Sequence, residues 1–318
     1  MTSAMLFRVR SALALTLGLM CGAAAGTEVR TGRPADVRET PGEMVFIPGG
    51  AFTQGADLIE INDLRGACRQ EHFGVTTILC EKDDLFYRMI GRTREVYVSP
   101  FAIDRHEVIV REYRACVAAG ACDRLPLVSG DTRWLADQLP MANVTWSEAG
   151  DFCRWASGRL PTEAEWEKAA RGTDARRWPW GGNDGDARAN RGQVAAPVVW
   201  TYQFPIREWI PDYVPDRRDG ADGPAPPGTY PWGTSPYGVE DMAGNVSEWV
   251  ADYLGDVGYA GLSPINPLNS VPGHFGYRVV RGGAFDEPPY LSRTYVRNGA
   301  EADSRSPGRG FRCVRDML

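Results

Sequence analysis

The chain has 318 residues and a formal net charge of −6, with acidic and basic side chains interspersed and no block of Lys or Arg. This pattern gives no support to a function in binding nucleic acids or anionic membranes. The 36 glycines and 23 prolines are spread along the whole chain. Such a composition favours an irregular, turn-rich fold over a helical one, and single loop-rich domains of this size are common.

The first 25 residues have the features of an export signal. Two arginines precede an apolar run at 12–20, and small residues at 23–25 offer a cleavage site. The run is too short to cross a bilayer, so we expect a periplasmic or secreted protein without a transmembrane helix. Cys21 leaves a lipoprotein as an alternative, although the two residues before it are bulkier than such a site prefers.

After a polar, aperiodic linker at 26–43, one domain is predicted over residues 44–318. Alternation and turn residues predict strands on either side of the Gly-Gly turn in 44–55, and further strands at 95–103, 277–281 and 310–314. Residues 57–92 show no clear period, and loops are expected to dominate residues 178–237.

Two helices are predicted with their caps. Over 147–157, Ser147 can cap the helix, and one buried stripe is formed by Ala149, Phe152, Cys153 and Ala156. Over 160–172, Thr162 and Glu165 form a capping box and Gly172 ends the helix.

Removal of the signal leaves six of the seven cysteines. An even number of cysteines in an exported protein predicts three disulfides. Cys116 and Cys122 are close enough in sequence to pair locally.

Six short runs, read in order, carry a family resemblance. They are MVFIPGG at 44–50, VTWSEA at 144–149, GRLPTEAEW at 158–166, MAGNVSEW at 242–249, RGG at 281–283 and GFRC at 310–313. Together they resemble the formylglycine-generating enzyme, or sulfatase-modifying factor, family over almost the whole predicted domain. The resemblance implies an α+β fold, the family's variant of the C-type-lectin-like fold, which is loop-rich with little regular secondary structure.

Enzymes of this family hold copper with two cysteines that follow the Arg-Gly-Gly turn. This chain has no cysteine between Cys153 and Cys313, and Glu287 and either Leu291 or Ser292 stand where the pair is expected. Bound copper is therefore not expected, and no catalytic residue is assigned.

Other positions of the family's active site also differ. Ala284 and Ser247 replace a serine and a tryptophan that shape the copper site. The polar and aromatic side chains that remain could line a ligand-binding groove or an ordinary solvated loop: Asp286, Glu287, Tyr290, Ser292, Arg293 and Arg297.

The resemblance also implies a cysteine pairing. Cys153 and Cys313 match a structural disulfide of the family, which leaves Cys68 to pair with Cys80. An alternative is that Cys68 and Cys80 form a displaced copper or redox pair, because two thiolates suit Cu(I). Oxidising surroundings favour the disulfide.

Structural calcium is the expected cofactor. The resemblance implies one site with side chains of Asp241 and Glu248 and carbonyls of Gly244 and Val246. A second family site maps onto the side chains of Asn190 and Asp222, with backbone oxygens near Arg191 and Pro224. The alternative is that Asp241 and Glu248 only cap turns.

The three histidines do not predict an iron site of the kind found in relatives that make sulfur-containing histidine betaines. His72, His106 and His274 lie in unrelated segments, and no paired histidine motif is present in the sequence.

Three functions are compatible with the sequence. The first is an exported, calcium-stabilised module that binds a protein, peptide or glycan in the former substrate groove. The second is a divergent oxidative tailoring enzyme like the pyoverdine-maturation relatives. The third is formylglycine generation through Cys68 and Cys80. The fold alone does not decide among them, because one scaffold hosts many functions.

Overall fold

The computed structural model describes residues 44–71, 80, 90–129, 132–182, 188–194, 200–203, 208–211 and 213–317. The predicted signal and linker lie outside the described residues. Among the described helices, none has both the length and the apolar character needed to cross a membrane.

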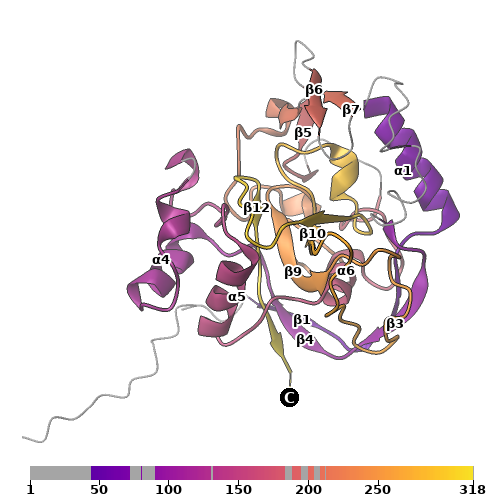
Figure 1. The fold of residues 1–318 in the computed structure, drawn as a ribbon, viewed down its shortest axis with the longest axis horizontal. Coiled ribbons are helices and arrows are strands. Elements are labelled where there is room, and N and C mark those ends of the chain that lie inside the picture. Colours follow the sequence, from indigo (N-terminus) through magenta and orange to yellow (C-terminus); the bar gives the residue numbers. More distant parts are fainter. Residues whose placement is uncertain are drawn as a thin grey trace, which may run out of the picture. The chain divides into compact units, whose positions relative to one another are not determined.

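Short strands outnumber helices in the described chain (Figure 1). The helices are α1 (Leu58–Glu71), α4 (Val110–Ala118), α5 (Trp146–Trp155) and α6 (Glu163–Arg171). The N-terminal strands are β1 (Met44–Ile47), β2 (Gly50–Gln54), β3 (Arg94–Val98) and β4 (Phe101–Asp104). The middle strands are β5 (Gly192–Val194), β6 (Trp200–Gln203), β7 (Glu208–Pro211) and β8 (Tyr213–Pro215). The C-terminal strands are β9 (Ser247–Tyr253), β10 (Arg278–Arg281), β11 (Arg297–Ala300), β12 (Arg309–Gly310) and β13 (Val314–Asp316).

The strands form small sheets that tie distant parts of the chain together. One sheet has the order β1-β4-β13, and another has the order β11-β10-β9-β12, in which β12 runs parallel to β9. The strands predicted in 44–55 are present but do not pair with each other: β1 pairs with β4, and β2 pairs with β3. The single strand predicted at 95–103 is two strands, because the chain turns at Ser99 and Pro100. The stretch expected to be loops contains the two-stranded ladders β5-β8 and β6-β7.

Helix α6 follows its prediction closely. The Thr162 hydroxyl accepts a hydrogen bond from the Glu165 amide at 3.2 Å, and the Glu165 carboxylate accepts one from the Thr162 amide at 2.7 Å. Gly172, with a φ of 70°, ends the helix. Helix α5 is also present, but the predicted cap at Ser147 is wrong. Thr145 is the cap and forms the reciprocal capping box with Glu148.

Two helices were not predicted. Helix α1 lies within the segment that shows no clear period, and buries Ile61, Leu64 and Cys68. Helix α4 begins after Ile109, which offers no polar side chain as a cap. Tertiary packing rather than local signals stabilises these two helices, so no short-range pattern predicted them.

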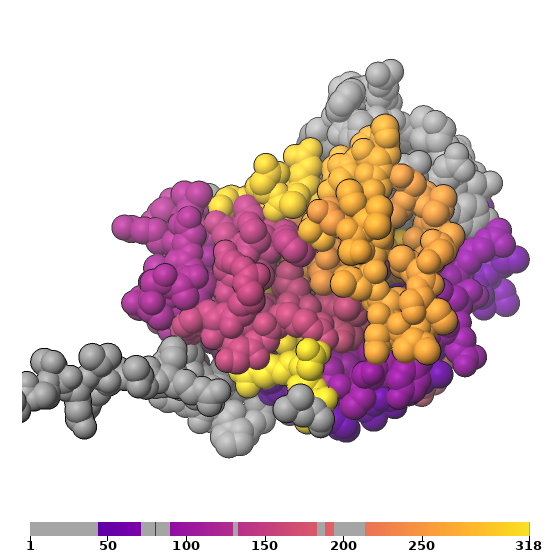
Figure 2. Space-filling view, turned by 60° about the horizontal axis from the view of Figure 1, so that its bottom comes forward, coloured from indigo at the N-terminus to yellow at the C-terminus, as the bar shows by residue number. Residues whose placement is uncertain are grey.

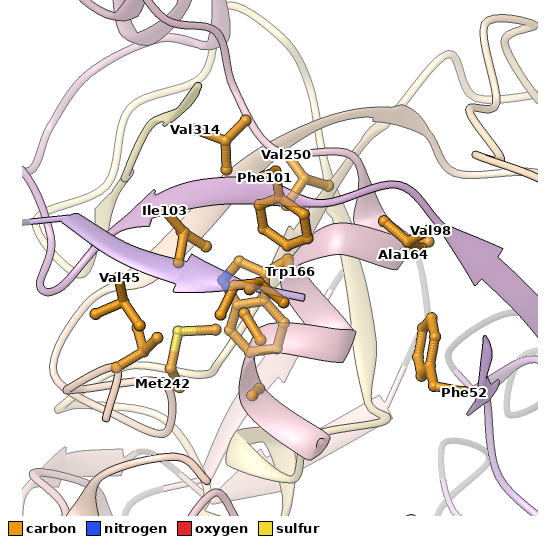
Figure 3. Close-up of a cluster of buried hydrophobic side chains, with 14 of the residues drawn as sticks. Val45, Phe52, Val98, Phe101, Ile103, Ala164, Trp166, Met242, Val250 and Val314 are labelled. Carbon is orange, nitrogen blue, oxygen red and sulfur yellow. The ribbon is translucent and has the colours of Figure 1, made fainter. Parts of the chain in front are cut away.

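The largest core cluster surrounds Trp166 of α6. Figure 3 shows this indole among apolar side chains from β1, β4, β9 and β13. Trp166 is fully buried, and its Nε1 donates to Glu248 Oε2 at 2.8 Å. The same carboxylate accepts two bonds from Arg312, at 2.7 and 2.8 Å. A buried indole therefore remains hydrogen-bonded, as the low polarity of the core requires.

Ion pairs connect α6 to the C-terminal sheet. Arg281 contacts Glu163 at 3.1 Å and Glu167 at 2.9 Å, and Arg297 contacts Glu163 at 2.6 Å. All four side chains are buried. Since Arg281 is shared by both carboxylates, removing Arg297 would leave Glu163 and Glu167 competing for a single buried guanidinium of this sheet.

The three predicted disulfides are present. They join Cys68 to Cys80, Cys116 to Cys122 and Cys153 to Cys313. The last one links α5 to the segment before β13. The displaced redox pair is therefore not present as free thiols: Cys68 and Cys80 form a buried disulfide in the cluster that also holds Tyr290 and Tyr295.

Candidate functional site

The candidate site begins at the turn that follows β10. Gly282 and Gly283 have φ angles of 91° and 68°, which side chains rarely adopt. A Cβ atom at position 283 would lie 2.5 Å from the Oγ of Ser292. Both glycines are thus required for the chain to turn close against 289–292.

Asp286 and Glu287 follow this turn and are each partly exposed. The Glu287 amide donates to the Ala284 carbonyl at 3.1 Å, and its carbonyl accepts from the Gly192 amide at 3.0 Å. Burial, and to a smaller extent the charge of Asp286, raise the pKa of Glu287 to about 7, with Arg309 opposing the shift. Burial also raises the pKa of Asp286. A carboxyl group with a pKa near neutrality can exchange a proton at physiological pH.

The rest of the predicted groove is packed into the protein. Tyr290 belongs to the cluster around the Cys68–Cys80 disulfide. Arg293 donates to Asp63 at 2.7 Å, and Arg297 is bound to the carboxylate of Glu163. These three residues therefore hold the fold together, while Asp286 and Glu287 are the members of the set that reach solvent.

The two positions expected for the copper-binding cysteines differ in burial. Glu287 is partly exposed, whereas Ser292 is fully buried and its Oγ has no hydrogen-bond partner among the described residues. Leu291 is half-buried and packs against the same cluster as Tyr290. Neither a carboxylate nor a hydroxyl is the soft ligand that Cu(I) prefers. Each of the six cysteines in the described chain is already in a disulfide.

The first predicted calcium site lies in a buried polar cluster. Asp241 has a φ of 55°, and its Oδ2 is shielded from solvent without a hydrogen-bond partner in the described chain. Burial raises the pKa of Asp241 to about 7, with Arg312 opposing the shift. Glu107 lies close by, and burial together with the charge of Asp241 raises its pKa well above the usual value. A divalent cation would compensate the excess of carboxylates over the single Arg312 guanidinium.

The two carboxylates predicted for this site are not equally available. Glu248 already accepts bonds from Arg312 and Trp166, whereas Asp241 keeps an oxygen without a donor. No group of three or more His, Cys, Asp or Glu side chains in the described residues could alone hold a metal ion. The cluster fits calcium only if backbone or amide oxygens, such as the predicted carbonyls of Gly244 and Val246, complete the coordination.

The two side chains predicted for the second calcium site, Asn190 and Asp222, lie in different surroundings. The Oδ1 of Asn190 is buried without a donor, and its Nδ2 contacts Asn245 Oδ1 at 3.2 Å. Asp222 lies instead at the surface in an ion pair with Arg217 at 2.7 Å. Asp219, which the sequence analysis did not select, accepts the backbone amide of Arg191 at 2.9 Å. The run Asp-Gly-Ala-Asp at 219–222 places two aspartates three residues apart, so sequence spacing alone does not decide which of them lies beside Arg191.

The described histidines do not come together in one site, although His106 adjoins the first cluster through the backbone of Glu107. His106 contacts the backbone oxygen of Glu107, and His274 is exposed beside Phe275. His72 lies outside the described residues.

Comparison with known proteins assigns the scaffold. The family model described as the sulfatase-modifying factor enzyme 1-like domain matches residues 30–317. The chain is 33% identical to the formylglycine-generating enzyme of Mus musculus, over 87% of this chain and 76% of that protein. It is 28% identical to the inactive C-alpha-formylglycine-generating enzyme 2 of Mus musculus, over 85% of both chains. The solved structure of PvdO from Pseudomonas aeruginosa superposes with a TM-score of 0.62 at 25% identity, over 86% of this chain and 94% of that chain.

The chain therefore belongs to the sulfatase-modifying factor family. The predicted α+β fold class is confirmed by the mixture of few helices and many short strands and by the similarity to PvdO. The family includes a protein named as inactive, so membership does not by itself assign the oxidase activity to this chain.

Proposed function

We propose that this chain is a binding or accessory module of the family that does not carry out copper-thiolate oxidation. The observation that carries this proposal is the replacement of the expected thiolate pair by the partly exposed Glu287 and either Leu291 or the buried Ser292. The disulfides of the described chain support it, because they leave no described thiol to take over the role.

The proposed ligand is a protein or peptide segment that presents a Lys or Arg side chain to Asp286 and Glu287. Burial raises the pKa of both carboxyl groups, and the charge of Asp286 adds to the shift of Glu287. A cationic group beside them would stabilise their ionised forms, since an opposite charge favours the charged state. A neutral glycan would supply hydrogen bonds but no such compensation.

A charge-matched set of variants tests this proposal. Fluorescence anisotropy would measure binding of labelled hexalysine, hexaglutamate and hexaserine peptides to the wild type and to Asp286→Asn/Glu287→Gln. We expect hexalysine to bind preferentially and the double variant to weaken it by about tenfold, the equivalent of roughly 1.4 kcal/mol. The control Glu301→Gln/Asp303→Asn removes the same charge from exposed positions. Equal losses in both double variants, or no preference for hexalysine, would contradict the proposed site.

Structural calcium and export are further parts of the proposal. The unpartnered oxygen of Asp241 supports the first calcium site, with Glu248, Gly244 and Val246 as its remaining predicted ligands, and that of Asn190 supports the second, predicted with Asp222. The ion would neutralise buried carboxylates and so stabilise the folded chain. The N-terminal sequence pattern and the three disulfides support export into an oxidising compartment.

A divergent enzyme is the second candidate, and the near-neutral pKa of Glu287 favours it. Such a carboxyl could accept a proton from a bound substrate as a general base. If turnover of any substrate is found, Glu287→Gln should abolish the ionisation near pH 7 in the rate profile, whereas Asp286→Asn should only shift it. A profile that Glu287→Gln leaves unchanged would exclude this role.

A further inference from the structure

A cleft of about 550 Å³ lies apart from the residues of the candidate site. Its walls come from α5, the turn between β3 and β4, residues 159–165, β9, residues 266–268 and the C-terminal residues 316–317. Figure 2 shows the face on which α5, the segment 250–277 and the C-terminal residues adjoin. A cleft of this size is large enough for a small organic ligand.

Three residues of α5 that lie four apart, Trp146, Gly150 and Arg154, face the cleft. This spacing places them on one stripe of the helix. Gly150 has no positive φ, and a Cβ there would meet only the end of the Arg154 side chain, at 3.4 Å. Neither backbone conformation nor close packing requires a glycine in the middle of this helix, where it is unfavourable relative to alanine. Its evident effect is to keep the cleft open beneath Arg154.

The ring of Trp146 is held in a fixed orientation at the cleft. Its Nε1 donates to the carbonyl of Val250 at 2.8 Å. The guanidinium of Arg278 lies 3.7 Å from the ring centroid and is itself stacked on Tyr253. Since a cation already covers one side of the indole, the surface that remains in the cleft suits an electron-rich ring better than a second cation.

The two arginines at the rim differ in how firmly they are held. Arg159 is bound by Glu165 at 2.7 Å and by Asp316 at 2.5 Å. Arg154 is paired only with the neighbouring Asp151 among the described contacts, and the two side chains are 69% and 45% exposed. Exposed pairs of this kind contribute little, so Arg154 can exchange Asp151 for another anion at small cost.

We propose that this cleft binds an aromatic carboxylate or sulfonate, with its rings on Trp146 and its acidic group on Arg154. The apolar side chains of Leu160 and Leu268 line the same cleft and would enclose the rings. The inference is independent of the proposed function, because no residue of the Asp286–Glu287 turn takes part in it.

Two fluorescent probes that differ only in charge test both halves of this inference. 1-Anilinonaphthalene-8-sulfonate carries the acidic group, and N-phenyl-1-naphthylamine has the same rings without it. We expect the sulfonate to bind the wild type with about tenfold higher affinity than the neutral probe, the gain of one charge-assisted contact. Arg154→Gln should remove this difference and leave the affinity for the neutral probe unchanged.

Gly150→Leu should fill the cleft and reduce binding of both probes by at least about tenfold, with the fold checked by circular dichroism. The control Arg114→Gln removes another exposed arginine, from α4, where its partner is Asp137. Leu268→Ser, at a surface position, provides a second test should Gly150→Leu not fold. Binding that neither Gly150→Leu nor Leu268→Ser weakens would place the probes elsewhere and overturn the site. Equal affinities of the two probes, or equal losses in Arg154→Gln and Arg114→Gln, would overturn the preference for an acidic ligand.

Discussion

The three disulfides should stabilise the fold by unequal amounts, because they close loops of very different length. The perturbation is to replace each pair in turn by alanines, which leaves the other two disulfides intact. The sequence separations are 12 for Cys68–Cys80, 6 for Cys116–Cys122 and 160 for Cys153–Cys313. In the chain-entropy view, a disulfide acts by restricting the unfolded chain, and a longer loop restricts it more.

The expected losses follow from the number of residues in each closed loop, which is one more than the separation: 7 for Cys116–Cys122, 13 for Cys68–Cys80 and 161 for Cys153–Cys313. At 25 °C the entropy relation gives about 2.4, 2.9 and 5.1 kcal/mol respectively. The long loop should therefore cost roughly 2 kcal/mol more than either short one. A loss of about 5 kcal/mol is comparable with the whole stability of many domains, so this double variant is expected to be marginally folded.

Urea denaturation of the three double variants and the wild type, followed by tryptophan fluorescence, would measure these differences. Equal m-values are needed for a direct comparison, since a changed slope would indicate altered compactness of the unfolded chain. Losses that are equal for all three pairs, or smallest for Cys153–Cys313, would refute the loop-length reasoning and point to local packing around each pair instead.

Further predictions concern calcium, ion pairing and pH. If free calcium exceeds its dissociation constant about a hundredfold, chelation should lower the melting temperature of the wild type by a few degrees. Asp241→Ala should abolish that response. A wild-type melting temperature that does not respond to the chelator would leave capping of a turn as the role of Asp241. Arg297→Met should cost about 3–5 kcal/mol in urea denaturation, because the buried Glu163 then keeps only Arg281, which it shares with Glu167. Arg297→Met/Glu163→Leu should recover much of the loss. Because the pKa of Glu287 is higher in the folded than in the unfolded chain, the folded state holds a proton on this carboxyl that the unfolded chain has lost. The resulting contribution to stability is complete below about pH 4 and is lost as the pH rises to about 7. Glu287→Gln should remove that part of the pH dependence of the urea midpoint, and an unchanged slope would contradict the raised pKa.

Local signals in the sequence were sufficient for some elements of the fold. The capping box of Thr162 and Glu165 lies entirely within one turn, so α6 was predicted with both ends correct to a few residues. Ser147 also had the residue type of a cap, but Thr145 has the partner Glu148 three residues later and forms the better box. Strand pairing depends on contacts far apart in the chain, such as β1 with β4, and no short-range pattern specifies it.

The candidate site was predictable in its position but not in its burial. The turn at 281–283 located Asp286 and Glu287, which reach solvent, but the same reasoning grouped them with Arg293 and Arg297, which are buried in ion pairs. An arginine in a loop is usually solvated, and its burial here depends on carboxylates of α1 and α6 that are distant in sequence. The cleft beside α5 was not predicted either, because its walls come from six separate segments.

The absence of copper-thiolate oxidation is the central claim, and one measurement tests it directly. Purified mature protein would be titrated with copper under mild reducing conditions and then incubated with a cysteine-containing peptide of the sulfatase type, with metal analysis and peptide mass spectrometry as the readouts. We predict neither stoichiometric copper nor a mass shift of the peptide, because Glu287 and either Leu291 or Ser292 replace the expected ligands and the described cysteines are in disulfides. Stoichiometric copper with turnover of the peptide, lost in Cys68→Ser, would contradict the claim and show that a relocated cysteine pair performs the oxidation.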